Sequence, residues 1–331
     1  MYNIQRYTYF LHFYSAKGHF MKQVFIDGAS GTTGLRIYER LAARSDISLI
    51  TLPEKDRKDP SAIRDALNRS DIAFLCLPDE AALEAAEMVE NPATVVLDAS
   101  TAHRTAAGWV YGFPELSESQ REAVRAGRRI AVPGCHASGM IALIYPLVES
   151  GLIRKDTALF CFSLTGYSGG GKKMIAQYQA GERSALLDAP RQYALTQRHK
   201  HLKEITHVTG LTVTPVFCPI VADFYSGMEV TVPLFIKDVQ GSAEDVRACL
   251  KNRYRDGLVR YQDGDDGDGF LSAAQMAWLD TMTVTVLGNE ERLLLCARFD
   301  NLGKGASGAA IQCMNLTMGV PEETGLCLVR K

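Results

Sequence analysis

One cysteine, Cys135, stands where its sulfur can act as a nucleophile. The segment VPGCHASGM, residues 132–140, joins an apolar strand to a helical pattern. At the start of a helix, unpaired backbone N–H groups and the positive end of the dipole stabilise a thiolate, and the same donors can hold an oxyanion. A structural role suits Cys76, Cys161 and Cys296 in their apolar segments, but it suits this glycine-flanked turn poorly. We therefore expect Cys135 to form a covalent adduct with an acyl substrate.

His199 and His201, in QRHKHL, are the candidates for proton transfer. Imidazole titrates near neutral pH, so either ring can deprotonate a thiol or protonate a departing oxygen. The pattern leaves the choice open, with His199 slightly favoured. An HxH pair can also bind a metal ion or lie on the surface, but no third ligand is evident, so we expect no metal.

A glycine-rich loop, GASGTTG, lies between an apolar strand and an amphipathic helix. Glycines in this position allow a tight turn and bring backbone N–H groups close to a pyrophosphate at the helix N-terminus. The spacing GxxGxxG differs from the common GxGxxG, and a tight turn that binds nothing is the alternative. The residues predicted to contact a dinucleotide here are Gly28, Ser30, Gly31, Thr32, Thr33 and Gly34.

The end of the next predicted strand, SLITL, indicates which dinucleotide binds. No acidic residue stands there to bond an adenosine ribose, and Glu54 comes slightly late. Lys55, Arg57 and Lys58 follow at once and suit a 2′-phosphate, which favours NADP. Ordinary surface charge is an equally good explanation.

The pattern of elements predicts an α/β fold in two parts. From Gln23 to about Gly134, short strands alternate with helices, as in a parallel sheet of Rossmann type: QVFID, LRIYERLAAR, IAFLCLP, EAALEAAEMVE, TVVLDAS and RIAVPG. After a helix that begins near His136, longer strands predict a mostly antiparallel sheet with helices on one face: TALFCFSLTG, TVTPVFCPI, MEVTVPLFI, TMTVTVLG and RLLLCARF. We expect a Rossmann-like dinucleotide-binding domain followed by an α+β catalytic domain.

Composition excludes several classes of protein. The chain has 331 residues, 47% of them hydrophobic, and a formal net charge of -2, which gives no field to attract nucleic acid or an anionic membrane. Its eight cysteines follow no disulfide or CxxC spacing, and no apolar run reaches the roughly 18 residues of a membrane span. We therefore expect a cytoplasmic protein with reduced thiols.

The opening twenty residues have no clear period, and the first strong strand follows Met21. We expect residues 1–20 to be dispensable, either because translation starts at Met21 or because the segment is disordered. The alternative is an ordered arm on a partner subunit, since its aromatic side chains would otherwise be exposed.

Beyond these local patterns, nearly everything after Met21 resembles the N-acetyl-γ-glutamyl-phosphate reductases, in particular their shorter subfamily. The resemblance implies NADPH as hydride donor, an acyl phosphate as substrate, N-acetylglutamate semialdehyde as product, a homo-oligomer, and Cys135 as the active-site residue. The motifs that carry it, in the family's order, are FIDGASGTTGLRIYERL, LDASTAHR, YGFPEL, VPGCHASGMIALIYPL, SLTGYSGGGKK, HKHLKEI, FYSGMEVTVPL and DNLGKGASGAAIQCMNLTMG.

The same resemblance implies further site residues. Arg104 matches an arginine that follows a strand end, where its guanidinium suits the leaving phosphate, although a surface ion pair is the alternative. Ser100 and His136, from the matching motifs, are assigned to substrate binding. Ser168 and Gly169 belong to a backbone-rich anion loop next to the cofactor. Asn301 is placed to meet the nicotinamide carboxamide.

The resemblance also sets the expected domain limits and leaves alternatives open. Residues 21–134 plus 301–331 are expected to form the NADP-binding domain, and residues 135–300 the catalytic domain. Ala222 and Ser226 stand where the family has glycine and glutamine, which weakens the case for one particular substrate. The alternatives are an aspartate- or aminoadipate-type semialdehyde dehydrogenase and a non-catalytic NADP-binding sensor.

Overall fold

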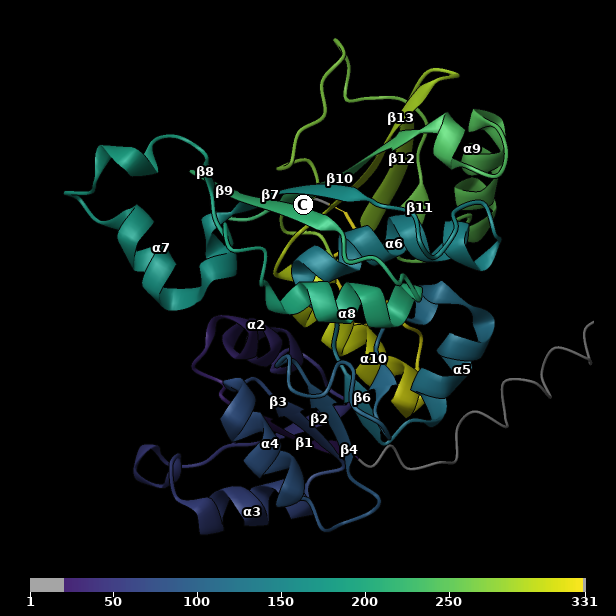
Figure 1. The fold of residues 1–331 in the computed structure, drawn as a ribbon. Coiled ribbons are helices and arrows are strands. Elements are labelled where there is room, and N and C mark those ends of the chain that lie inside the picture. The colour runs from purple at the N-terminus through teal and green to yellow at the C-terminus, as the bar shows by residue number, and fades with distance from the viewer. Residues whose placement is uncertain (1–20, 330–331) are drawn as a thin grey trace, which may run out of the picture.

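The computed structural model describes residues 21–329, which form two sheets with helices between and around them (Figure 1). The expectation for residues 1–20 lies outside the described residues. None of the described helices is long and apolar enough to cross a membrane. All eight cysteines are free.

Sheet A is the parallel sheet that the alternating pattern predicts. Its six strands lie in the order β2-β1-β3-β4-β6-β5, and every neighbouring pair is parallel. The strands are β1 (Lys22–Asp27), β2 (Ile47–Ile50), β3 (Ile72–Leu75), β4 (Val95–Asp98), β5 (Val110–Tyr111) and β6 (Arg129–Ala131). Since β1 has β2 on one side and β3 on the other, the chain reverses its winding at the end of β1, where such sheets bind nucleotides.

Helices cover both faces of sheet A. One face packs against α2, α5 and α10, and the opposite face packs against α3 and α4. The bounds are α2 (Thr32–Leu41), α3 (Pro60–Arg69), α4 (Asp79–Glu87), α5 (Glu118–Ala126) and α10 (Gly308–Met318). Helix α10, near the C-terminus, therefore shares a core with the first half of the chain.

Sheet B is mixed, with mostly antiparallel pairs. Its order is β11-β12-β13-β10-β7-β9-β8, and only the pairs β11–β12 and β7–β9 are parallel. The strands are β7 (Phe160–Gly166), β8 (Arg191–Gln192), β9 (Val216–Ala222), β10 (Met228–Phe235), β11 (Val259–Tyr261), β12 (Met282–Gly288) and β13 (Arg292–Phe299). The short strands β8 and β11 were not predicted. The strand expected over 212–220 begins only at Val216, directly after Pro215.

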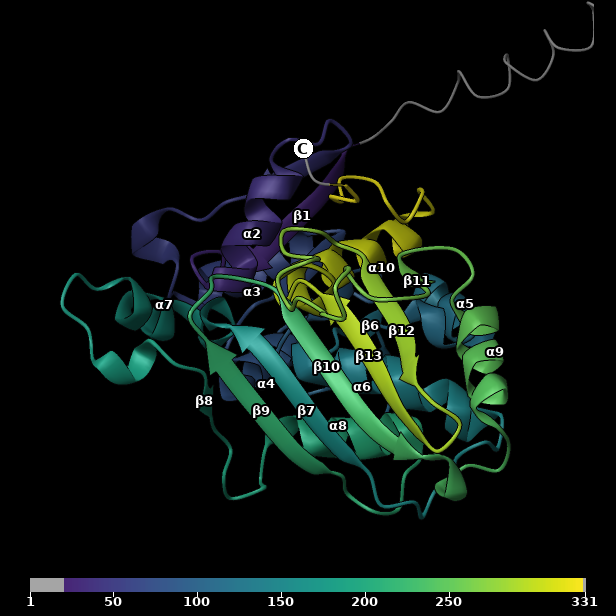
Figure 2. The ribbon, with the colours of Figure 1, turned by 90° about the horizontal axis from the view of Figure 1, so that it is seen from above.

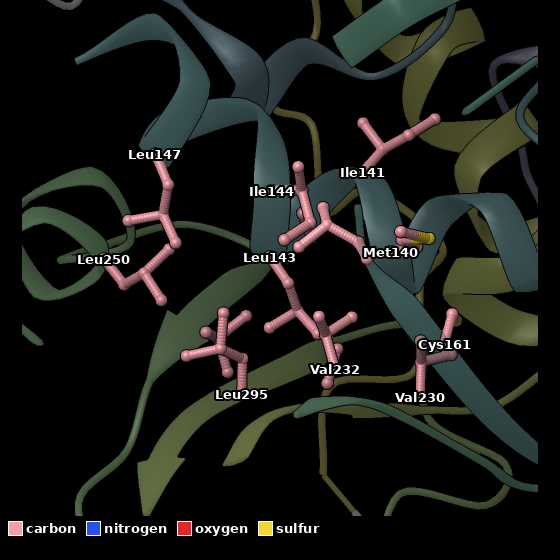
Figure 3. Packing of buried hydrophobic residues seen from close by; sticks show 14 of the residues in the cluster. Met140, Ile141, Leu143, Ile144, Leu147, Cys161, Val230, Val232, Leu250 and Leu295 are labelled. Carbon is pink, nitrogen blue, oxygen red and sulfur yellow. The ribbon is translucent and has the colours of Figure 1, made fainter. Parts of the chain in front are cut away.

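One face of sheet B carries the larger core. Helices α6 (Cys135–Glu149), α8 (Lys200–Thr209) and α9 (Ala243–Arg253) cover it, while α7 (Gly171–Gln179) projects to the side (Figure 1). Figure 3 shows Leu143 of α6 pointing toward Val232 of the sheet. A Cβ at Gly139 would lie 2.4 Å from a methyl carbon of Val230, so α6 sits directly against β10.

The other face of sheet B is not covered by any described helix (Figure 2). Its strands expose large apolar side chains, among them Phe160 (51% exposed), Phe162 (46%) and Leu294 (43%). An apolar sheet face of this kind usually marks an interface. We call these three residues, with Val216 and Phe235, the outer apolar face.

Candidate active site

A cavity of about 370 Å³ lies where the two halves of the chain meet. The glycine-rich loop before α2 reaches it through Thr33, and the loop after β4 reaches it through Arg104. The remaining lining residues come from the start of α6, the segment after β7, the segment leading into α8 together with its first turn, and the turn before α10. We call this the catalytic cavity; its chemically important lining residues are Cys135, His136, Gly169, Tyr193, His199, Lys200, His201, Asn301 and Gly305.

Cys135 is the first residue of α6, as the sequence predicts for a nucleophile. The backbone N–H groups of Cys135 and His136 lie at the sulfur and favour its anion, and Arg104 acts in the same direction. Burial outweighs these effects and raises the pKa of the Cys135 thiol to about 11. The resting cysteine is therefore a thiol, and it needs a base when it attacks.

His201 lies beside the turn that precedes Cys135. A Cβ at Gly134 would lie 2.3 Å from both His201 Nε2 and Arg104 Nη1, so only glycine lets these groups approach. His201 is 5% exposed, and its Nδ1 has no hydrogen-bond partner among the described residues. Burial and the nearby Arg104 hold the pKa of His201 well below its usual range. The ring is therefore neutral at pH 7 and keeps one nitrogen lone pair as an acceptor.

His199 has a local structural function. Its Nδ1 accepts a hydrogen bond of 3.3 Å from the backbone N–H of His201 and so caps α8. The ring is half-buried, and burial lowers its pKa. His199 lines the catalytic cavity too, but the glycine turn before Cys135 is closer to His201. His201 is thus the histidine that lies against the turn before Cys135, whereas the sequence pattern slightly favours His199 for proton transfer.

Arg104 is fixed by a buried ion pair that the sequence did not reveal. Its Nη1 donates to Glu204 Oε2 at 3.0 Å, and its Nε and Nη2 donate to the carbonyls of Val132 and Ala99. The two side chains are only 7% and 2% exposed. A guanidinium has five N–H groups, so two remain for a ligand in the cavity.

Glu204 also holds the turn before Cys135. Its Oε1 accepts hydrogen bonds from the backbone N–H of Gly134 at 2.8 Å and from Tyr111 Oη at 2.7 Å. A sequence signal was present: on α8, residues 201, 205 and 209 are buried at helical spacing, and Glu204 stands on the same face. A carboxylate on a buried helix face requires partners, and here they are Arg104, Tyr111 and Gly134.

His136 lies in the cavity, but both ring nitrogens are engaged. Nδ1 is 2.6 Å from Ser163 Oγ, and Nε2 is 2.6 Å from Tyr193 Oη. Burial lowers the pKa of His136 to about 3, so the ring is neutral. His136 therefore orients Tyr193, whose hydroxyl faces the same cavity and which sequence reasoning missed.

The far end of the catalytic cavity carries the groups predicted to meet the nicotinamide. Asn301 accepts a 3.0 Å hydrogen bond from the backbone of Gly227 and donates one of 2.9 Å to Ser168 Oγ. Gly169 and Thr33 line the cavity beside it. Ser168 is buried and does not line the cavity. Its hydroxyl orients the Asn301 side chain through the hydrogen bond between them.

A second cavity, of about 770 Å³, opens at the end of β1. We call it the adenosine cavity. Gly28 has φ +79, and a Cβ there would lie 2.3 Å from the carbonyl oxygen of Cys76; at Gly34 it would lie 2.4 Å from the carbonyl oxygen of Gly28. Because these two glycines have no side chain, the loop packs directly against the sheet and against itself. This packing leaves the cavity open, and the loop residues fit the pyrophosphate of a dinucleotide. The cavity is lined by Gly28, Ser30, Tyr38, Leu49, Leu52, Glu54, Lys55, Arg57, Lys58 and Leu77.

Some predicted site residues line neither cavity. Ser100 is buried, and its hydroxyl donates to Asp98 Oδ2 at 2.7 Å, which shapes the loop that carries Arg104. Gly31 caps α2, and Thr32 begins it. Ser100, Gly31 and Thr32, like Gly34 and Ser168, pack next to lining residues without reaching either cavity.

Comparison with protein families covers both halves of the chain. The model described as "Semialdehyde dehydrogenase, NAD binding domain" matches residues 23–124. The model described as "Semialdehyde dehydrogenase, dimerisation domain" matches residues 135–301, beginning at the candidate nucleophile.

Curated relatives match along nearly their whole length. A Pseudomonas putida protein named "N-acetyl-gamma-glutamyl-phosphate reductase 2" is 42% identical over 311 residues, covering 91% of this chain and 98% of its own. A Nostoc protein of the same name is 41% identical over 318 residues, covering 92% and 99%. A Burkholderia lata "N-acetyl-gamma-glutamyl-phosphate reductase" is 41% identical over 309 residues, covering 90% and 97%.

Solved structures share the fold at low identity. Aspartate semialdehyde dehydrogenase II from Vibrio cholerae, complexed with ASA, superposes with a TM-score of 0.69 at 16% identity, covering 90% of this chain and 98% of its own. Aspartate semialdehyde dehydrogenase from Francisella tularensis has a TM-score of 0.67 at 13% identity, covering 90% and 100%.

The raised pKa of Cys135 predicts how the thiol reacts in the absence of substrate. Its rate of alkylation by iodoacetamide should rise roughly tenfold per pH unit from about pH 7 to pH 9.5, because only the thiolate reacts. Mass spectrometry of the peptide that contains Cys135 measures this rate. A rate that is already constant between pH 6 and 8 would show a preformed thiolate and contradict the prediction.

Proposed function

The chain belongs to the N-acetyl-gamma-glutamyl-phosphate reductase family of semialdehyde dehydrogenases, and we propose that it reduces N-acetyl-γ-glutamyl phosphate to N-acetylglutamate 5-semialdehyde and phosphate. This is a reduction step of arginine biosynthesis. The single observation that supports this chemistry best is the position of Cys135 at the start of α6, in one cavity with neutral His201 and with Arg104.

In the first step, Cys135 Sγ attacks the acyl carbon while His201 Nε2 takes the thiol proton. The C–O bond to phosphate breaks, and the proton passes from His201 to the departing phosphate. The two free N–H groups of Arg104 hold the phosphate oxygens. The product of this step is a thioester on Cys135, which keeps the substrate in place for reduction.

NADPH supplies the hydride that reduces the thioester carbon. The backbone N–H groups of Cys135 and His136 stabilise the oxyanion that then forms. Tyr193, oriented by His136, lies in the same cavity. When the oxyanion collapses, the C–S bond breaks, the aldehyde leaves, and a solvent proton restores the thiol.

The residues that would hold the cofactor lie in both cavities. The Gly28–Gly34 loop would bind the pyrophosphate at the start of α2, and Thr33 of this loop lines the catalytic cavity. Asn301 and Gly169, which line the same cavity, would hold the nicotinamide. Lys55, Arg57 and Lys58 line the adenosine cavity and have no ion-pair partner among residues 21–329, so they are available to a 2′-phosphate.

The outer apolar face fits a second copy of this chain. It lies on the part that matches the dimerisation model, and its large apolar side chains are exposed in the single chain. Burial of apolar area stabilises association by about 25 cal/mol per Å² before the entropic costs. We propose that two copies pair through this face.

The proposed reaction predicts phosphate-dependent oxidation of N-acetylglutamate semialdehyde in the reverse direction. NADPH formation should exceed that with aspartate semialdehyde, and Cys135→Ser should reduce kcat on the order of 10³-fold or more, because the nucleophile acts at every turnover. Cys249→Ser, a change at a half-buried cysteine outside both cavities, is the matched control and should keep its activity. Preference for aspartate semialdehyde would keep the mechanism and reject the substrate.

The adenosine cavity predicts which residues select NADP. The double change Arg57→Ala and Lys58→Ala should raise KM for NADPH about tenfold or more and leave KM for NADH nearly unchanged, since only NADPH carries the extra phosphate. Arg64→Ala, at an exposed arginine of α3 that pairs with Glu90, is the control. An equal rise in KM for NADPH and NADH would instead indicate that the double change distorts the segment that carries Arg57 and Lys58.

The outer apolar face predicts a change of assembly. Phe162→Arg should convert the oligomer to monomers in sedimentation velocity, because it places a charge in the proposed interface. Leu83→Arg, at an equally exposed leucine of α4 (46%), should leave the assembly intact. An unchanged oligomer in Phe162→Arg would place the interface elsewhere.

A further inference from the structure

The catalytic cavity must offset the charge of its ligand. An acyl phosphate carries a doubly charged phosphate, and placing such a group in a partly enclosed cavity is costly unless positive charge faces it. The cationic candidates among the lining residues are Arg104, Lys200 and the histidines His136, His199 and His201. The question is which of them keeps a net positive charge.

The histidines do not supply it. Burial lowers the pKa of all three, and for His201 the nearby Arg104 adds to the effect. Each ring is therefore neutral at pH 7. Protonated histidine is absent from the resting cavity.

Arg104 offers hydrogen bonds but little net charge. Its guanidinium lies 3.0 Å from Glu204, and both side chains are almost fully buried. At that distance the carboxylate cancels most of the field of the guanidinium beyond the pair. Arg104 can orient phosphate oxygens, but a second cation is needed to balance them.

Lys200 is that cation. It is the first residue of α8, it is exposed, and it lines the cavity. It has no hydrogen bond or ion pair to any of the described side chains. Its charge acts through space on Asp79, whose carboxylate is occupied by Thr101.

Lys200 occupies a position in α8 that is unfavourable for a positive charge. A lysine in the first turn of a helix opposes the dipole, and acidic residues are preferred there. The first turn of α8 contains no acidic residue. The helix start, the lysine and the remaining N–H groups of Arg104 thus all present positive potential to one cavity, as an anion requires.

We propose that Lys200 binds the phosphate of the acyl phosphate and supplies the net positive charge that the Arg104–Glu204 pair lacks. This inference rests on the proposed function. Arg104 sets the direction of the phosphate through its planar donors, while the flexible stem of Lys200 follows the phosphate as the C–O bond breaks.

Steady-state kinetics with inorganic phosphate test this assignment. In the phosphate-dependent oxidation, Lys200→Met should raise KM for phosphate about tenfold or more and leave KM for the aldehyde within about twofold. Lys200→Arg should restore most of the affinity for phosphate. Lys203→Met, at an exposed lysine of the same helix that lines neither cavity, should match the wild type. Added salt should raise KM for phosphate in the wild type more than in Lys200→Met.

A binding readout separates this inference from the proposed function. Inorganic phosphate should slow alkylation of Cys135 in the wild type and in Lys200→Arg, and much less in Lys200→Met. Protection of this kind supports the phosphate site even if the acetylated aldehyde is not a substrate. An unchanged KM for phosphate with unchanged protection, or a raised KM for the aldehyde alone, overturns the assignment.

Discussion

The buried carboxylate of Glu204 is the contact on which the geometry of the site depends. It joins three segments that are distant in the chain: the loop of Arg104, the turn at Gly134, and helix α8 itself. Removing one partner of such a buried pair costs about 3–5 kcal/mol, because the other charge stays buried. The pair is thus a constraint on both halves of the molecule. Arg104 and the turn at Gly134 hold their positions relative to α8 because both donate hydrogen bonds to this one carboxylate.

Small residues make that arrangement possible. Gly134 allows Arg104 and His201 to approach the turn, and a Cβ at Gly305 would lie 3.0 Å from Cys135 Cβ. Gly28 and Gly34 play the same part at the other cavity. The polar groups can therefore surround the sulfur and the cofactor at short range, and the sheets and helices beneath them provide the rigidity that glycines lack.

Local patterns in the sequence were enough to predict the parallel sheet, the glycine loop, and the cysteine at the start of a helix. The reason is that each depends on residues within about ten positions of one another. The contacts of the His136 ring and the pairing of Arg104 with Glu204 join residues 27 to 100 positions apart. The cap formed by His199 depends on a single hydrogen bond. Spacing alone does not encode such contacts. The sequence of α8 did indicate one such contact, because a glutamate on its buried face, Glu204, requires a hydrogen-bond donor or a cation nearby.

The protonated state of Cys135 has a consequence outside the catalytic cycle. Peroxides and electrophilic metabolites attack thiolates far faster than thiols, and oxidation beyond the sulfenic acid is mostly irreversible. A sulfur whose pKa is raised to about 11 spends little time as an anion while the cavity waits for substrate. The burial that keeps Cys135 protonated therefore also protects the sulfur from chemical damage between turnovers.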